Sequence, residues 1–201
     1  MTNILNINHV IFDWSGTLYD DHEPSFMATK RVIFDLSGHA ITREEYKEHF
    51  SIPVHPFYQR YGIKESFEKI DGYYFATYRH YIDQGELFDG VIESLKVLKK
   101  HKIKVSIFST VHTDMIERLV DNLGLSKYID FIQGGVVNKI KEMKAHLKNM
   151  NSDPVECLYI GDMDHDVESA NKNKVLSGCV CSGYHEPVSY THLRAHETRP
   201  Y

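Results

Sequence analysis

The chain has 201 residues, of which 42% are hydrophobic and 25% are charged, and its formal net charge is −5. This length suffices for a buried core plus an inserted second domain, and the acidic balance argues against a general nucleic-acid binder. No stretch approaches the roughly 20 apolar residues of a membrane span, and the N-terminus does not resemble a signal peptide. We therefore expect a cytoplasmic globular protein with no nucleic-acid or membrane partner.

The first predicted element is a short buried strand at residues 9–13, with the sequence His-Val-Ile-Phe-Asp. Its apolar run ends in a single carboxylate, Asp13, and the turn residues Gly16 and Thr17 follow closely. In open α/β sheets, functional sites form at the carboxyl ends of the strands. The pattern therefore predicts that Asp13 lies at such a site.

Residues 20–85 have a helical pattern. A helix is predicted from Glu23 to Ser37, and a second begins with a capping box in which Thr42 is the N-cap and Glu45 the N3 residue. A third helix is predicted in the aromatic-rich last part of the region. The region holds 13 of the 23 phenylalanines and tyrosines of the chain, which indicates the core of a small helical domain.

From residue 86 onward, helices and strands alternate. Strands are predicted at residues 104–108, 131–132, 157–160 and 175–181, and the last helix is predicted at residues 167–173. This alternation is typical of an α/β fold with a doubly wound parallel sheet. Because the strand at residues 9–13 belongs to the same sheet, we predict an α/β core made of residues 1–19 and 86–187. Residues 20–85 are then an all-helical cap domain inserted after the first strand.

Residues 188–201 have neither a strand pattern nor a clear helix pattern, and their composition changes abruptly. The run from Ser189 to Thr198 resembles a sequencing adapter translated in frame, and the alternative is a genuine polar tail. We interpret the segment as non-native and leave it out of fold prediction. His192 and His196 are for this reason not interpreted as a metal site.

Polar residues with related chemistry follow the predicted strands. They are Asp13 after the first strand, Ser109 after the strand at residues 104–108, Lys139 at a helix start, and Asp162 and Asp166 in the run Gly-Asp-x-x-x-Asp. Together they resemble the haloacid dehalogenase superfamily, whose first motif is Asp-x-Asp-Gly-Thr. The run from Asp13 to Thr17 matches that motif except that Ser15 replaces the second aspartate. The resemblance extends over residues 8–187 and is least specific in the helical region.

The resemblance implies a Mg²⁺-dependent hydrolase of the phosphoglycolate phosphatase type, acting on a small phosphorylated metabolite. It assigns Asp13 as the nucleophile that forms an aspartyl-phosphate. It also implies that Ser109 donates a hydrogen bond to the phosphoryl group and that Lys139 supplies positive charge. The Mg²⁺ ligands that it implies are Asp13, the backbone carbonyl of Ser15, Asp162 and Asp166.

Several of these positions have alternatives in the sequence. Thr110 is an alternative to Ser109 as the phosphate donor, and Lys141 or Lys144 is an alternative to Lys139. Acidic residues also favour helix N-termini, so Asp162 and Asp166 have a second interpretation as helix caps.

Ser15 removes one chemical step from the implied mechanism. In phosphatases of the superfamily the second aspartate protonates the leaving alcohol and helps to activate water. Serine has no useful acid or base at neutral pH, and general acid–base catalysis contributes roughly 10²–10⁴-fold. The metal ligand at this position is a backbone carbonyl and is retained. We therefore predict that ligand binding persists more readily than turnover.

Two further functions stay open at this point. The first motif also resembles that of phosphonoacetaldehyde hydrolase, which cleaves a C–P bond and needs a cap lysine for a Schiff base. The candidate cap lysines are Lys30, Lys47, Lys64 and Lys69, none of which lies in a Met-Gly-x-x-Lys context. The other function is that of a catalytically weak protein that binds a phosphate ligand or regulates. No oligomeric state is predicted.

Overall fold

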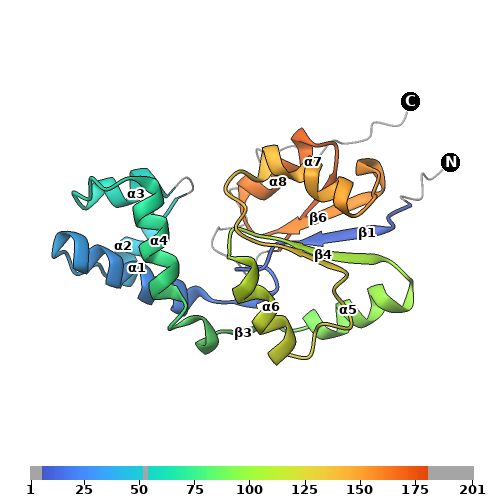
Figure 1. The fold of residues 1–201 in the computed structure, drawn as a ribbon, viewed down its shortest axis with the longest axis horizontal. Helices are drawn as coiled ribbons and strands as arrows, with labels where there is room; N and C mark the ends of the chain where they lie inside the picture. The colour runs from blue at the N-terminus through green and yellow to red at the C-terminus, as the bar shows by residue number, and fades with distance from the viewer. Residues whose placement is uncertain (1–5, 52–53, 181–201) are drawn as a thin grey trace. The chain divides into compact units, whose positions relative to one another are not determined.

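The structure is a computed structural model that describes residues 6–51 and 54–180 (Figure 1). The predicted non-native tail, residues 188–201, lies outside the described residues. The chain divides into two compact units, one within residues 1–19 and 87–201 and the other within residues 20–86. Two short strands, β2 (Tyr19–Asp20) and β3 (Glu86–Leu87), pair where the chain passes between the units.

The first unit contains a five-stranded sheet in the order β5-β4-β1-β6-β7, and all its pairings are parallel. The strands are β1 (His9–Phe12), β4 (Lys104–Phe108), β5 (Phe131–Gln133), β6 (Cys157–Gly161) and β7 (Leu176–Cys179). The main helices are α5 (Val91–Lys100), α6 (Thr113–Asn122), α7 (Lys139–Asn149) and α8 (Asp164–Lys172), with a short 3-10 turn η2 (Pro154–Glu156). Helices α7 and α8 cover one face, and α5 and α6 the other (Figure 1). The predicted doubly wound α/β fold is confirmed.

Strand β1 is the central strand, and all four of its residues are buried. A strand covered on both faces is largely apolar, which accounts for the hydrophobic run from Val10 to Phe12. Phe12 at its end pairs with Ile107 of β4 and with Ile160 of β6. The chain order reverses between β1 and β6, so the carboxyl ends of these strands border the switch point of the sheet.

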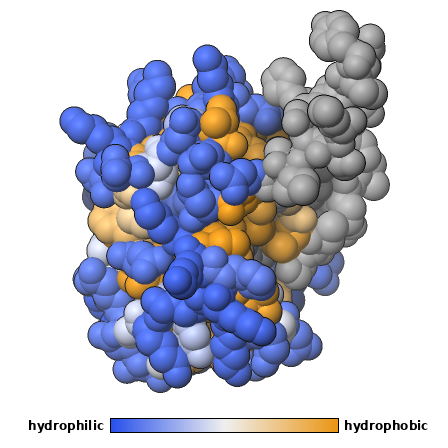
Figure 2. Space-filling view, turned by 90° about the vertical axis from the view of Figure 1, so that its right-hand side faces the viewer, coloured by the Kyte–Doolittle hydropathy of each residue, from blue (hydrophilic) through white to orange (hydrophobic). Residues whose placement is uncertain are grey.

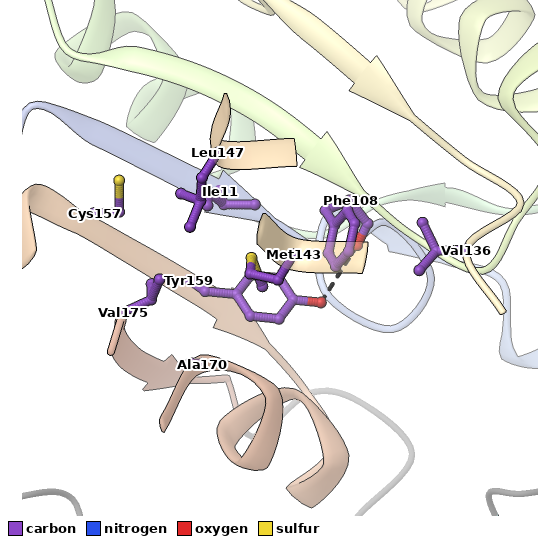
Figure 3. Close-up of a cluster of buried hydrophobic side chains, with 9 residues drawn as sticks. All are labelled: Ile11, Phe108, Val136, Met143, Leu147, Cys157, Tyr159, Ala170 and Val175. Atoms are coloured by element: carbon purple, nitrogen blue, oxygen red, sulfur yellow. Dashed lines mark hydrogen bonds between the residues drawn. The ribbon is translucent and has the colours of Figure 1, made fainter. Parts of the chain in front are cut away.

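A cluster of nine buried side chains joins the sheet to α7 and α8 (Figure 3). Its members are Ile11, Phe108, Val136, Met143, Leu147, Cys157, Tyr159, Ala170 and Val175. Most are aliphatic or aromatic, and their removal from water stabilises the docking of both helices. Tyr159 also brings a polar group into this cluster, and its hydroxyl oxygen lies 3.3 Å from the backbone carbonyl oxygen of Phe108.

The second unit is helical. Its helices are α1 (His22–Ser37), α2 (Arg43–His49), α3 (His55–Arg60) and α4 (Phe67–Tyr78), followed by the 3-10 turn η1 (Ile82–Gln84). The predicted capping box is present, because Glu45 N–H donates to Thr42 Oγ1 at 3.1 Å and Thr42 N–H donates to Glu45 Oε2 at 2.8 Å. Helix α1 ends at Gly38, whose φ of 75° lies in the left-handed region that glycine favours.

Aromatic residues form the interior of the helical unit. Tyr46, Phe57, Tyr58 and Tyr78 are buried there, and neighbouring rings meet edge to face or stacked. Their hydroxyls are not left unpaired, since Tyr46 shares a hydrogen bond with Ser25 and Tyr78 donates to Asp21. The aromatic enrichment of this region therefore belongs to a small-domain core.

Figure 2 looks onto the side of the molecule that lies to the right in Figure 1, and hydrophilic residues cover most of that face. Separate hydrophobic areas show between them. No helix within residues 6–51 and 54–180 combines the length and the apolar character that a membrane span requires.

Four polar side chains form a chain of hydrogen bonds inside the α/β unit. His9 Nε2 lies 2.7 Å from Ser106 Oγ, which lies 2.7 Å from His146 Nε2, and His146 Nδ1 lies 3.0 Å from Gln133 Oε1. These hydrogen bonds link β1, β4, β5 and α7. Burial is the main cause that lowers the pKa of His9 to about 4 and that of His146 to about 3; Lys104 lowers the pKa of His9 further, and Asp130 opposes this change.

We expect these two histidines to make the folded state sensitive to acid. An unfolded histidine has a pKa near 6.5, so between pH 6.5 and about 4 the unfolded chain binds more protons than the folded one. The free energy of unfolding then falls as the pH falls. Urea unfolding at pH 7, 6 and 5 measures the slope, which His146→Gln should reduce and which the exposed control His101→Gln should leave unchanged. Equal slopes in the parent and in His146→Gln would contradict this prediction.

Candidate active site

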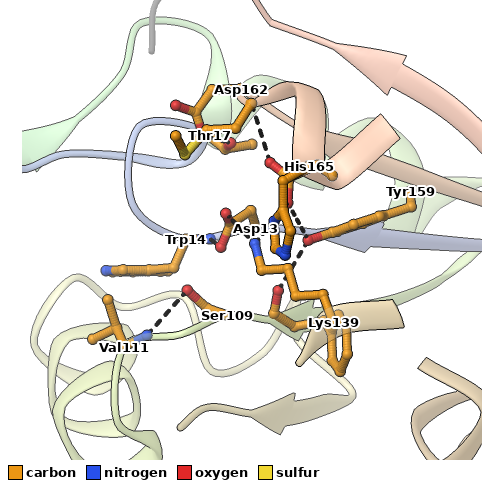
Figure 4. A network of polar contacts seen from close by, with 12 residues as sticks. Asp13, Trp14, Thr17, Ser109, Val111, Lys139, Tyr159, Asp162 and His165 are labelled. Carbon is orange, nitrogen blue, oxygen red and sulfur yellow. Dashed lines mark hydrogen bonds and ion pairs between the residues drawn. The ribbon is translucent and has the colours of Figure 1, made fainter. Parts of the chain in front are cut away.

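The polar residues singled out in the sequence meet at the switch point of the sheet (Figure 4). Asp13 follows β1, Ser109 follows β4, and Asp162 follows β6. Lys139 is the first residue of α7, and Asp166 lies in the first turn of α8. All five are buried. The fold thus brings together residues that are separated by up to 153 positions in the chain.

Lys139 connects the two sides of the site. Its Nζ donates to Asp13 Oδ2 at 2.6 Å and to Asp166 Oδ1 at 2.7 Å, and the side chain is only 3% exposed. Burial alone would disfavour the ammonium, but the two carboxylates outweigh it and raise the pKa of Lys139 above its usual range. Although burial opposes ionisation of Asp166 as well, the charge of Lys139 outweighs it and lowers the pKa of Asp166.

Asp13 is held in place at both of its oxygens. The backbone N–H of Trp14 donates to Oδ1 at 2.7 Å, and Lys139 donates to Oδ2. The hydroxyl of Ser109 also hydrogen-bonds to this carboxyl group, and Ser109 Oγ accepts the N–H of Val111 at 3.4 Å. Burial raises the pKa of Asp13, while Lys139 and Ser109 act in the opposite direction. Further positive charge at the site therefore favours the ionised form of Asp13.

A tight turn follows Asp13. The backbone N–H groups of Leu18 and Tyr19 both donate to the carbonyl of Trp14, and Gly16 has a φ of 73°. This geometry explains the glycine of the motif, because other residues rarely adopt that conformation. The turn directs Thr17 to Asp162, where its hydroxyl donates to Oδ1 at 3.2 Å. Ser15 is half-buried in the same turn.

Asp166 has three donors around its carboxylate. Oδ1 accepts from Lys139 and from the hydroxyl of Tyr159, 2.9 Å away, and Oδ2 accepts the backbone N–H of Met163 at 3.1 Å. The last contact caps α8, which begins at Asp164, three residues before the predicted start. Asp166 therefore caps a helix and belongs to the polar site at once, so the two interpretations of this residue are compatible.

The sequence did not single out Tyr159. The residue is fully buried, and its ring lies 5.7 Å below Lys139 Nζ, within the range of a cation–π contact. Burial raises the pKa of its phenol well above the ordinary value, which keeps the proton that it donates. A tyrosine at an apolar strand position has no sequence signal that distinguishes it from a core residue.

The alternative candidates for the lysine and for the hydroxyl donor of the site differ in burial. Lys141 and Lys144 are exposed on α7, whereas Lys139 is buried against both carboxylates. Thr110 is half-buried, and Ser109 is fully buried beside Asp13. His165 is half-buried, and its Nδ1 lies 3.9 Å from Asp166 Oδ1.

The acidic residues form a donor set that fits a divalent cation. One carboxylate oxygen each of Asp13, Asp162 and Asp166 lies within 4.8 Å of the others. Carboxylate oxygens are the ligands that Mg²⁺ prefers. Three carboxylates beside a single ammonium group also leave an excess of negative charge in a buried place, which is costly without a counter-ion. A cation of charge +2 would balance it.

The fold and the site define the class of protein: an α/β protein with a buried acidic site, bridged by a lysine, at the switch point of its sheet. A model of the family described as haloacid dehalogenase-like hydrolase matches residues 10–180. The chain belongs to this family and is a hydrolase, which confirms the resemblance found in its motifs.

Similar proteins agree with this assignment. A relative from Clostridium perfringens, named "Putative pyrophosphatase PpaX", is 29% identical over 182 residues, which make up 86% of this chain and 83% of that protein. The crystal structure of a "predicted phosphatase" from Clostridium acetobutylicum has a TM-score of 0.80 at 21% identity and covers 94% of this chain and 91% of its own. A haloacid dehalogenase-like protein from Bacteroides fragilis has a TM-score of 0.82 at 21% identity, with 92% and 93% covered.

We expect Gly161→Ala to disturb the site. A Cβ atom at Gly161 would collide with the carboxylate of Asp166, so Asp166 must move away from Lys139 or α8 must shift. Gly178→Ala on the neighbouring strand is a matched control, because its Cβ would meet Ile160 at an ordinary 3.4 Å. Thermal unfolding and calorimetric titration with Mg²⁺ measure the effect. Equal melting temperature and Mg²⁺ affinity for Gly161→Ala and the parent would contradict the expectation.

Proposed function

We propose that the protein is a Mg²⁺-dependent phosphatase that hydrolyses a small phosphorylated metabolite through an aspartyl-phosphate on Asp13. The observation that carries the proposal is the buried set of Asp13, Asp162 and Asp166 with Lys139 between two of its carboxylates. A phosphoryl group is itself anionic, so a carboxylate reaches its phosphorus only where positive charge is concentrated. The family and the phosphatase names among similar proteins support the same activity.

In the proposed reaction, Asp13 is the nucleophile. Contacts from Trp14 and Lys139 fix the orientation of its carboxylate, so little reorientation is needed before attack. An oxygen of Asp13 forms the bond to phosphorus while the bond to the leaving group breaks, and water later hydrolyses the acyl phosphate. Lys139 and Ser109 both lie next to the Asp13 carboxyl group, and they would donate hydrogen bonds to the phosphoryl oxygens.

The metal would be held by Asp13, Asp162 and the backbone carbonyl of Ser15, with Asp166 as a further ligand or as the partner of Lys139. When bound, Mg²⁺ supplies charge neutralisation and orients the phosphoryl group. The contact from Thr17 to Asp162 would keep that carboxylate turned towards the site. The helical unit, residues 20–86, is proposed to act as the cap that selects the substrate.

The C–P hydrolase function receives no support from the structure. It requires a lysine that forms a Schiff base, and such lysines are activated by desolvation or by a neighbouring cation. The four candidates in the helical unit, Lys30, Lys47, Lys64 and Lys69, are all exposed. Lys69 is moreover paired with Glu65 at 2.8 Å.

We expect Asp13→Asn to abolish the Mg²⁺-dependent release of phosphate, because an amide cannot form the acyl phosphate. The assay measures phosphate release from a panel that includes pyrophosphate, phosphoglycolate and 4-nitrophenyl phosphate, with and without Mg²⁺. Lys141→Met, an exposed residue of the same helix, is the control and should retain activity.

Activity that survives Asp13→Asn would remove Asp13 from the role of nucleophile. The binding or regulatory function predicts instead a turnover far below about 1 s⁻¹, the lower end of ordinary enzymes, on every substrate of the panel.

A further inference from the structure

The buried hydrogen-bond chain from His9 to Gln133 is built on the elements that hold the candidate active site. Three of these elements each provide one residue of the site and one member of the hydrogen-bond chain. The pairs are Asp13 and His9 for β1, Ser109 and Ser106 for β4, and Lys139 and His146 for α7. Gln133, at the end of β5, also accepts the backbone N–H of Ser109 with its carbonyl oxygen at 3.0 Å.

Ser106 is the centre of the hydrogen-bond chain. Its Oγ lies 2.7 Å from Nε2 of both His9 and His146, and all three side chains are fully buried. The pKa values of both histidines lie far below 7, so each ring is neutral and can either donate or accept. Because a hydroxyl has a single proton, Ser106 donates to one ring and accepts from the other. One oxygen atom of β4 thus joins β1 to α7.

Helix α7 depends on side-chain contacts for its place on the sheet. Its backbone groups are paired within the helix, so no backbone ladder sets its register as in a strand. Met143 and Leu147 stabilise its packing, but apolar contacts have no preferred direction. Lys104 of β4 donates to the carbonyl of Met150 at 2.8 Å, through a long and half-buried side chain. The short and fully buried hydrogen bond of His146 is directional, and it limits how far α7 can rotate or slide.

The place of α7 decides where Lys139 lies. Lys139 and His146 are seven residues apart, which is about two helical turns and about 10 Å along the axis, and both are buried on α7. A rotation or shift of the helix at His146 therefore moves Lys139 as well. Lys139 also ties its own end of the helix to Asp13. Under the proposed function its ammonium turns to a phosphoryl group, and the hydrogen bonds of His146 remain.

We propose that Ser106 and His146 are positioning residues, which through the hydrogen-bond chain keep Lys139 and Ser109 at the spacing that a phosphoryl group requires. This inference rests on the proposed function and adds to it the residues that arrange its phosphate-binding groups. Neither side chain touches the substrate in this proposal. Misplacing such a group by about 1 Å can cost about 10²-fold in rate.

Ser106→Ala tests the proposal by removing one oxygen atom. Calorimetric titration measures the affinity for inorganic phosphate at saturating Mg²⁺, and kcat/KM is measured on the best substrate of the panel. We expect the phosphate dissociation constant to rise and kcat/KM to fall, each by about tenfold. The affinity for Mg²⁺ alone should stay as in the parent, because Asp13 and Asp162 follow β1 and β6, which a backbone ladder joins directly.

Two further variants test whether the hydrogen bonds are the cause. His146→Leu breaks the hydrogen-bond chain from the side of α7 and should weaken phosphate binding at least as much as Ser106→Ala. Because both changes remove the same link, the double variant should bind phosphate no more weakly than His146→Leu. Ser106→Thr retains a hydroxyl and should recover phosphate affinity. Folded Ser106→Thr with an affinity as low as that of Ser106→Ala would contradict the proposal.

Two controls separate position from stability. Leu147→Val shortens a buried side chain of α7 and leaves the hydrogen bonds of His146 in place, so it should lower the melting temperature and keep the phosphate affinity. Ser169→Ala makes the same chemical change as Ser106→Ala at another fully buried serine. The Oγ of Ser169 has no hydrogen-bond partner among residues 6–51 and 54–180, so both quantities should stay as in the parent.

The outcomes separate this inference from the proposed function. Equal phosphate affinity and kcat/KM in the parent and in Ser106→Ala overturn the inference and leave the phosphatase function intact. An equal loss in Leu147→Val also overturns it, because the effect then follows stability. A parent that binds phosphate but hydrolyses no compound overturns the proposed function, and the phosphate affinities of the variants still decide the inference. A parent that does neither overturns both.

Discussion

The ammonium group of Lys139, held between Asp13 and Asp166, is the interaction on which the site depends. Its two short contacts lie in a buried place, where each of the three charges would be costly alone. Removing any partner would leave an uncompensated charge rather than simply a lost contact. The position of α7, which begins with Lys139, and that of α8, which begins two residues before Asp166, are therefore coupled through one nitrogen atom.

Much of the surrounding structure allows or supports this ion pair. Gly161 has no side chain where the Asp166 carboxylate lies against the end of β6, and Tyr159 supplies a hydrogen bond from below. Further along α7, His146 joins a buried hydrogen-bond chain to β4 and β5. The inner face of α7 thus carries two polar residues, Lys139 and His146, next to the apolar Met143 and Leu147, which pack into the core. Polar contacts fix the position of the helix, and the burial of apolar side chains stabilises its packing against the sheet.

The parts that the sequence predicted well are those governed by local rules. Apolar runs that end in a polar residue identified the strands at residues 9–13, 104–108 and 157–160, and the parallel order brought Asp13, Ser109 and Asp162 to one edge. The start of α8 was placed three residues late, because its first turn is acidic and has no apolar periodicity. Tyr159 and the hydrogen bonds that link His9, Ser106, His146 and Gln133 could not be predicted in the same way. Their partners are distant in sequence, and their residue types also occur in a core.

The pairing of β2 with β3 has a topological consequence. The chain enters the helical unit at Asp20 and leaves it at Glu86, and the two strands that contain these residues, β2 and β3, are hydrogen-bonded neighbours. The segment between β2 and β3 is a single insertion that interrupts no strand of the five-stranded sheet. Under the proposed function such an insertion is exchangeable: a different insert joined to the same two strands would alter what the protein recognises, while Asp13 and its neighbours are encoded elsewhere in the chain. Substrate recognition and reaction would in this way diverge independently in one chain.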